Sequence, residues 1–395
     1  MILKKKLLIN GLLASVVLLG ASITHAEIIF SESFDNQPDW NSGLAVNDLK
    51  GGDGIPDTEQ NVGEGYLLPN NWDFVYQNPT LSPYLGYPDK RDVIAIDAAD
   101  SSKARGGTGK RFLQQRVSHS ASGSFTSDGQ LMKLLDGAGG VGAGYDAVYF
   151  EFYIAFDPTW SGYNGTVQNL AKLVRLASWN GSGSPFQAFP GGNEGPLFFW
   201  QYEINSYGVR NVYGMRGGPW GDNYYLTNAQ VGDLPRVAMN YAGDTVGRGV
   251  GGTTPQITDK VNGSYISDNL NQTVGHEQIW GTGGTYTKVA FYVKMNSAPG
   301  VGDGQIIQWL DDVQMMNVQN IVWVPSLTQG LTEMPKWTSL SIGGNDFFKN
   351  YPLEDGRQEW WAIDDIKVST EIPNYLLSDS NNTAPPKPPL GITVE

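Results

Sequence analysis

Residues 285–312 read TYTKVAFYVKMNSAPGVGDGQIIQWLDD and predict two antiparallel strands joined by a loop. In the first strand, apolar residues alternate with a second face that carries Lys288, Tyr292 and Lys294. Strict alternation indicates a strand with one face in a core. The loop SAPGVGDG contains a proline and several glycines, which end both strands and helices. The stretch therefore predicts a hairpin whose outward face carries a phenol between two ammonium groups.

The composition favours an all-β protein that binds flat ligands. The chain has 50 Gly, 12 Trp, 19 Tyr and 15 Phe among 395 residues, which is typical of short strands, many turns and exposed rings. It has no cysteine, which excludes disulfides, thiolate metal sites and a cysteine nucleophile. The net charge of −14 argues against general binding of nucleic acid or anionic membranes.

The first 26 residues have the pattern of a cleaved secretory signal peptide. Three lysines precede an apolar run, and Thr24-His25-Ala26 is a plausible cleavage site. The run is short for a membrane helix, and no later stretch is apolar enough to cross a bilayer. We therefore expect a secreted or periplasmic protein, with cell-surface association left open. A sandwich domain is expected over residues 27–370, followed by a Pro-rich linker or disordered tail over 371–395.

Further strands recur along the chain and complete a sandwich. They are expected over residues 28–30, 111–119, 148–156, 169–178, 197–205, 339–343 and 359–370. The segment GQLMKLLDG at 129–137 is the best short helix candidate. Many short strands separated by turn signals predict an all-β sandwich of antiparallel sheets with long loops.

Three motifs carry a resemblance to a known family. They are FSESFDN at 30–36, Y-x-x-V-x-F-Y-V-K-M-N followed by DG-x-x-x-x-W-x-D at 286–311, and WWAIDDIKVST at 360–370. Together they resemble the concanavalin A-like jelly roll of secreted carbohydrate-active proteins. The order of elements is most similar to polysaccharide lyases of the alginate and glucuronan lyase kind. The resemblance implies a jelly-roll β-sandwich that acts on an extracellular, acidic polysaccharide.

The sequence also departs from that family. The R-x-E-x-R, Q-I-H and Y-F-K-x-G-x-Y-N-Q motifs of the best-known alginate lyases are missing, which leaves the activity open. The E-x-D-x-x-E strand of jelly-roll glucanases is also missing, which disfavours a retaining glycoside hydrolase. A non-catalytic carbohydrate-binding or surface-adhesion module is the main alternative to a lyase. We expect a monomer in either case.

Cleavage of a uronate polymer by β-elimination needs a group that neutralises the carboxylate, a base and an acid. Three stretches offer such groups: residues 114–119, NLAKLVRLAS at 169–178, and the strand at 287–294. The predicted catalytic residues are Tyr292, His119, Lys172 and Arg116, and the predicted polar substrate-binding residues are Lys288, Lys294 and Gln114.

Alternation limits which of these residues meet. Arg116 and His119 fall on opposite faces of a regular strand, and so do Lys172 and Arg175, of which we favour Lys172 for the groove. The basic residues between 103 and 116 suggest an anionic ligand, although a solvated loop paired with nearby acids explains them equally well.

Aromatic side chains are the expected platforms for sugar rings. Trp200, Trp220 and Tyr225 lie in or beside segments expected at the rim. Rings stack on the apolar faces of sugars. Tryptophan in a sandwich is more often a core residue, so the glycine-rich surroundings of Trp220 make it the stronger candidate.

Two groups of acidic residues are candidates for structural calcium. Asp53, Asp57 and Glu59 in GDGIPDTEQ match half of an Asp-rich calcium loop. Glu32, Asp35 and either Asp364 or Asp365 form the second group, since the resemblance implies a calcium between the first and last strands. We favour Asp365 for that site. Hard oxygen ligands suit calcium better than zinc.

Overall fold

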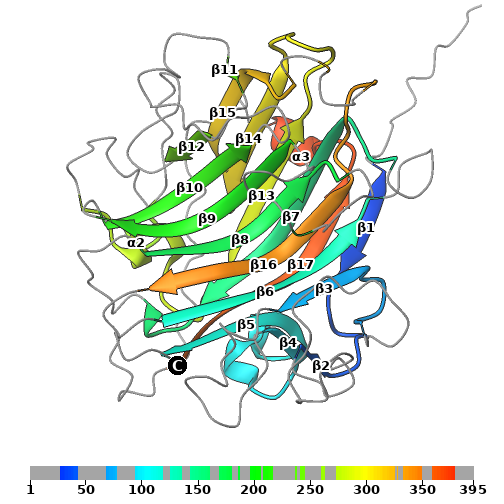
Figure 1. The fold of residues 1–395 in the computed structure, drawn as a ribbon. Coiled ribbons are helices and arrows are strands. Elements are labelled where there is room, and N and C mark those ends of the chain that lie inside the picture. The colour runs from blue at the N-terminus through cyan, green and yellow to red at the C-terminus, as the bar shows by residue number, and fades with distance from the viewer. Residues whose placement is uncertain are drawn as a thin grey trace, which may run out of the picture.

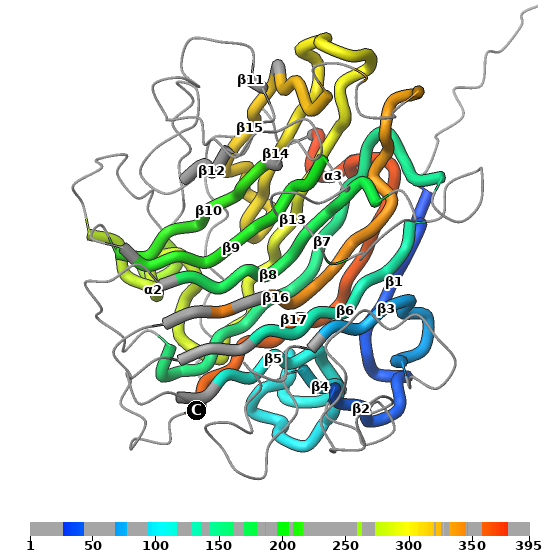
Figure 2. The backbone as a smooth tube through the Cα atoms, in the orientation of Figure 1, coloured from blue at the N-terminus to red at the C-terminus, as the bar shows by residue number. Residues whose placement is uncertain are grey.

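The computed structural model describes most of the chain (Figures 1 and 2). The described residues are 27–42, 68–77, 94–118, 125–135, 143–160, 169–179, 186, 196–205, 208–216, 236–237, 241–244, 259–262, 273–324, 327, 332–348 and 358–378. Within them, no helix is long and apolar enough to cross a membrane.

One sheet, here called the β13 sheet, contains the predicted hairpin. Its strands in spatial order are β2 (Trp40–Asn41), β4 (Ile94–Asp97), β5 (Arg111–Ser118), β17 (Gln358–Ser369), β7 (Ala147–Phe156), β13 (Thr287–Lys294), β14 (Gly304–Leu310), β15 (Val313–Val322) and β11 (Arg236–Val237). The first strand, β1 (Ile28–Glu32), pairs with the second half of β17. All these pairings are antiparallel except that of β11 with β15.

The second sheet, here called the β8 sheet, lies in front of the first in Figure 1. Its strands in spatial order are β3 (Phe74–Gln77), β6 (Phe125–Leu134), β16 (Ser339–Phe348), β8 (Asn169–Ala177), β9 (Leu197–Asn205), β10 (Gly208–Arg216) and β12 (Tyr241–Asp244). Every neighbouring pair is antiparallel. The ends of β5 and β6 also pair, so one hairpin joins the two sheets.

Helical structure is minor among the described residues. It consists of the 3-10 turns η4 (Ser101–Lys103) and η5 (Arg105–Gly107) and the short helices α2 (His276–Trp280) and α3 (Asn374–Ser378). The fold is thus a jelly-roll β-sandwich, as predicted.

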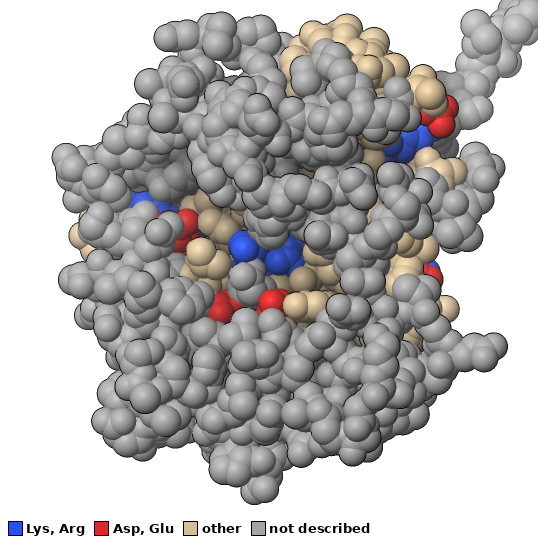
Figure 3. Space-filling model, viewed as in Figure 1, with Lys and Arg blue, Asp and Glu red and all other residues tan. Residues whose placement is uncertain are grey.

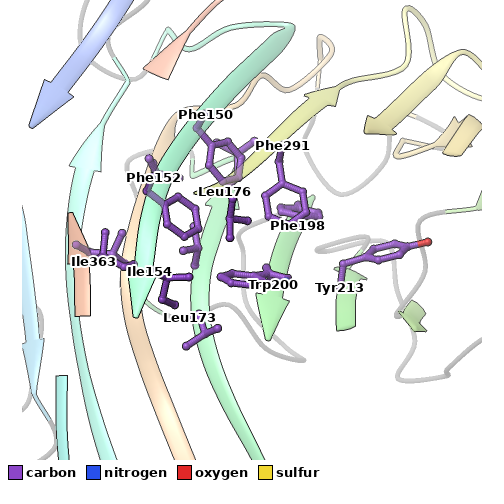
Figure 4. Close-up of a cluster of buried hydrophobic side chains, with 14 of the residues drawn as sticks. Phe150, Phe152, Ile154, Leu173, Leu176, Phe198, Trp200, Tyr213, Phe291 and Ile363 are labelled. Atoms are coloured by element: carbon purple, nitrogen blue, oxygen red, sulfur yellow. The ribbon is translucent and has the colours of Figure 1, made fainter. Parts of the chain in front are cut away.

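The core lies between the two sheets (Figure 4). Strands β7 and β13 contribute Phe150 and Phe291, and β9 of the other sheet contributes Phe198 and Trp200. The Phe291 ring centroid lies 5.0 Å from that of Phe198 and 5.9 Å from that of Trp200. The alternation that predicted the hairpin therefore reflects burial against the opposite sheet.

Two sequence expectations need correction. Residues 129–134 belong to strand β6 and not to a helix, because β6 pairs with β16 along its whole length and pairing across a sheet outweighs local helix propensity. At the C-terminus the ordered domain extends past residue 370. Helix α3 packs on the β13 sheet, where the Leu376 side chain is buried with Trp309.

Replacing Phe291 with alanine should destabilise the sandwich by about 3–5 kcal/mol, since it removes a ring that both sheets contact. Denaturant unfolding of the purified protein measures this loss. Val301→Ala, at an exposed position, should change the free energy of unfolding by less than about 0.5 kcal/mol. Equal effects of the two changes would contradict this description of the core.

Candidate functional site

Strand β8 contains an irregularity that turns two cations to the same face. Lys172 pairs with Gln201 of β9, but the next paired residue, Val174, lies opposite Trp200. Leu173 and Val174 are both fully buried in the core. This β-bulge shifts the alternation by one residue, so Lys172 and Arg175 both face outward. The expectation that they lie on opposite faces is therefore wrong, because it assumed a regular strand.

A second irregularity lies beside the first, on strand β16. Pairing with β8 stops at Ile342 and resumes at Asp346. Between them, Gly343 has a φ of 92°, a backbone conformation that favours glycine. A Cβ on the next residue, Gly344, would lie 2.7 Å from the Lys172 carbonyl oxygen and 3.0 Å from Arg175 Nη2. The pair of glycines, here called the glycine bulge, leaves space for the Arg175 guanidinium.

A glutamine from the opposite sheet holds the glycine bulge in place. Gln114 Nε2 donates to the Gly344 carbonyl oxygen at 2.6 Å, and the Gly344 N–H donates to Gln114 Oε1 at 3.2 Å. The Gln114 side chain is fully buried. The structure places this predicted substrate-binding residue beneath the outward face, in the core.

The guanidinium of Arg175 is buried and incompletely hydrogen-bonded. The residue is only 5% exposed, and its Nε and Nη1 have no hydrogen-bond partner among the described residues. Buried polar groups are nearly always paired, so an unpaired one calls for an explanation, such as a bound ion, water or ligand. Burial lowers the pKa of Arg175 to about 10, against the opposing effect of Asp128, Asp346 and Tyr76. Arg175 therefore remains a cation at neutral pH.

Asp128 on β6 supplies an opposite charge on this face, and it interacts electrostatically with Arg175 and Lys172. It pairs in register with Asn345 of β16, next to the glycine bulge. Burial raises its pKa to about 6, although Arg175 and Lys172 both act to lower it. An aspartate that titrates near neutrality is a candidate functional group.

These residues belong to a row of polar side chains across the β8 sheet, which the glycine bulge of β16 interrupts. We call this row the polar strip; its members are Tyr76, Asp128, Gln130, Lys172, Arg175, Gln201, Glu203 and Arg210. Gln201 Nε2 donates to Glu203 Oε2 at 3.0 Å, and Glu203 lies opposite Arg210. In the space-filling view, basic side chains lie together in a recess at the centre of this face, with acidic ones close by (Figure 3).

The residues predicted on β13 face the other side of the molecule. Tyr292 is half-buried on the outward face of the β13 sheet. It packs against the cluster that contains Trp309 of β14 and Leu376 of helix α3. Burial and the charge of Glu371 raise its pKa. The structure therefore does not bring Tyr292 together with Lys172.

Lys288 takes part in an ionic network on the same outward face of the β13 sheet. Its ammonium lies 3.2 Å from Glu151, 2.8 Å from Asp312 and 2.7 Å from the Tyr375 hydroxyl. These contacts attach helix α3 to the sheet. Lys294 shares this face at the end of β13, where its side chain is half-buried.

Two other predicted residues lie in the interior. Arg116 is fully buried, donates to Glu359 at 2.8 Å and stacks over the Trp160 ring, with its guanidinium carbon 3.1 Å from the ring centroid. Trp200 is also fully buried and donates to Asn211. It is a core residue and not a rim platform, because it lies on the inward face of β9. His119, Trp220 and Tyr225 lie outside the described residues.

The acidic residues at the first and last strands bind basic groups and amides. Glu32 accepts from the Phe34 N–H at 2.6 Å, Asp35 accepts from the Lys110 N–H at 3.0 Å, and Asp365 forms an ion pair with Arg105. Among the described residues, no three Asp, Glu, His or Cys side chains form a group suited to a metal ion. Asp53, Asp57 and Glu59 lie outside these residues.

Sequence reasoning missed most of the polar strip. Asp128 directly precedes the segment expected to be a helix, and Arg175 was set aside by assuming regular alternation. The alternation of Gln201 and Glu203 with apolar residues along β9 was a usable signal for an outward polar face.

Neither a protein-family model nor a curated protein sequence matches this chain. It is similar in structure to an endo-β-1,4-glucuronan lyase from the fungus Trichoderma reesei, with 11% identity, a TM-score of 0.38, and coverage of 76% of this chain and 92% of that one. A double mutant of alginate lyase Aly36B in complex with alginate tetrasaccharide gives 10% identity, a TM-score of 0.38, and coverage of 86% and 96%. The botulinum neurotoxin serotype G binding domain has 10% sequence identity and a TM-score of 0.30, with coverage of 81% of this chain and 49% of that one. These similarities assign no role to any residue of the polar strip.

Asp128→Asn should raise the stability of the protein at neutral pH. Folding raises the pKa of Asp128 from 3.8 to about 6. Between these two pH values the unfolded state binds fewer protons than the folded state, so the free energy of unfolding falls as pH rises. The variant should gain about 1–3 kcal/mol at about pH 7.5 and little at about pH 4, as measured by denaturant unfolding. Asp146→Asn, at an exposed carboxyl, is the control. An Asp128→Asn protein with no gain at the higher pH would contradict the loss of hydration that raises the pKa of Asp128.

Proposed function

We propose that this protein binds an acidic polysaccharide along the polar strip and cleaves it by β-elimination at a uronate residue. The observation that carries the proposal is the Arg175 guanidinium, buried beside Lys172 with two nitrogens that lack partners among the described residues. A uronate carboxylate accepts two parallel hydrogen bonds from such a group. In a chain of net charge −14, two adjacent outward-facing cations give this face a local positive potential that suits an anion.

The chemistry of β-elimination accounts for the position of the two cations. Removing the proton at C5 places negative charge on the uronate carboxyl group, and cations fixed at that group stabilise the charge. Arg175 and Lys172 supply them without rearrangement, since the β8 bulge already turns both toward the same face and the glycine bulge leaves space for the guanidinium. The low solvent exposure of Arg175 strengthens this interaction.

The dimensions of the polar strip suit a polymer. From β3 to β10 the strip crosses six neighbouring strands, which corresponds to about 24 Å at the usual spacing between strands. Glycan units on either side of the bound uronate would meet Gln130 and Tyr76 in one direction and Gln201, Glu203 and Arg210 in the other.

A hydrolytic mechanism fits the polar strip less well. Its carboxylates, Asp128 and Glu203, lie on strands separated by three strand spacings, or about 14 Å. Glycoside hydrolases place their two carboxyl groups roughly 5–9.5 Å apart. A binding module without catalysis would use the same strip, and turnover decides between it and a lyase.

Export and calcium binding are further proposals that depend on sequence patterns alone. N-terminal sequencing of the protein recovered from the periplasm or medium tests cleavage after Ala26. Thermal unfolding with calcium and with a chelator tests whether the protein binds a structural calcium ion. An unchanged melting temperature would count against a structural calcium at either predicted group.

The purified protein should release unsaturated uronate from at least one of alginate, glucuronan, pectate, ulvan or a glycosaminoglycan. Ultraviolet absorbance of the new double bond and a reducing-end assay should rise together. Lys172→Met and Arg175→Met should each lower kcat/KM at least about 100-fold, because each removes a cation from the developing charge. Lys336→Met, at an exposed lysine away from the strip, is the matched control.

Other outcomes would identify the alternatives. Reducing ends without ultraviolet absorbance indicate a hydrolase, and glycan retention without either signal indicates a binding module. If Tyr292→Phe abolishes turnover while Lys172→Met does not, the active site lies on the outward face of the β13 sheet and this proposal is wrong.

A further inference from the structure

We propose that Asp128 is the base that removes the C5 proton of the bound uronate. The inference rests on the function proposed above and adds a catalytic residue that neither the sequence motifs nor the structural similarities indicate. It depends on three features of the polar strip: the position of Asp128 across the glycine bulge, the charges that face it, and the absence of a better-placed carboxylate among the described residues.

The two bulges place Asp128 opposite the cations. Asp128 and Gly129 of β6 pair with Asn345 and Gly344 of β16, and Gly344 contacts Lys172 of β8 on its other side. The backbones of β6 and β8 are two strand spacings apart, or about 10 Å. A carboxylate held by Arg175 would therefore lie near the glycine bulge, and in the proposed pose the adjacent C5 atom lies on the β6 side of it, toward Asp128.

The surroundings of Asp128 suit a base that works near neutral pH. Arg175 and Lys172 of β8 both act to lower the pKa of Asp128. Tyr76 of β3 pairs in register with Gln130, two residues along β6 from Asp128. Asp346 of β16 points into the core, where it accepts a hydrogen bond from Trp361. Burial dominates and brings the pKa of Asp128 to about 6. A carboxylate of this pKa is ionised at neutral pH and more basic than an exposed aspartate, which favours proton abstraction.

The other acid of the polar strip is less suited to this step. Glu203 accepts a hydrogen bond from Gln201 and lies opposite Arg210, on the far side of β8 from the glycine bulge. Lys172 and Arg175 are cations that stabilise the negative charge of the intermediate. Asp128 is thus the carboxylate of the strip that lies across the glycine bulge from the two cations.

The proposed step conserves atoms and charge. Asp128 takes the proton from C5, and the C5–H electron pair is delocalised onto the carboxyl group that Arg175 binds. The pair then forms the C4=C5 double bond as the C4–O4 bond breaks. The leaving O4 takes a proton from the Lys172 ammonium, so the products are an unsaturated uronate and a new chain end. Solvent returns the proton to Lys172 and removes it from Asp128.

The test compares Asp128→Asn and Asp128→Glu with the Asp146→Asn control on the polymer that the native protein cleaves. Asp128→Asn should lower kcat about 100- to 10,000-fold, the usual contribution of a general base. Its dissociation constant for the polymer, measured by calorimetry, should stay the same or decrease, because the change removes a negative charge near the bound anion. Asp128→Glu should retain part of kcat, and formate should restore part of it to Asp128→Ala.

The pH dependence provides a second readout. For the native protein, kcat/KM should fall tenfold per pH unit below about pH 6, and this acid limb should be missing from the residual activity of Asp128→Asn. If Asp128→Asn keeps kcat within threefold and changes only KM, Asp128 is a counter-ion and the inference is wrong. A native protein that binds polymers and releases no unsaturated product would overturn the lyase proposal itself, and this inference with it.

Discussion

The two hydrogen bonds between the Gln114 amide and the backbone of Gly344 are the constraint on which the outward face depends. They join the β13 sheet to the β8 sheet at the point where β16 departs from regular pairing. Without them, a glycine-rich bulge would leave buried backbone groups unpaired, at a cost comparable to a lost hydrogen bond. The core thus determines the shape of the surface, and a buried glutamine acts on a site that it does not touch.

The chain balances opposite requirements at this face. Arg175 is buried and Asp128 is partly buried, and burial disfavours the charged form of each. A pair of apolar residues at these positions would stabilise the sandwich more effectively. Retaining charges here is characteristic of a functional site, where stability is given up for chemistry.

The fold was predictable because its signal is local. The alternation around Phe291 and the turn residues after Asn296 identify a buried hairpin without knowledge of its partners. The candidate site was not predictable, because it depends on the pairing register of β8 and β16. A single extra residue at Leu173 moves Arg175 to the other face, and nothing in the sequence around it marks a bulge. Tyr292 shows the converse: an outward-facing residue that helix α3 covers.

Helix α3 has a practical consequence for anyone who attaches this domain to a surface or to another protein. Through Tyr375 it is attached to Glu151 and Lys288 on the outward face of the β13 sheet, so the described chain ends at Ser378 behind the sandwich. The polar strip lies on the opposite outward face. A linker or immobilisation tag joined directly after α3 would therefore begin on the side of the sandwich away from the polar strip, so a solid support would be attached to the opposite face.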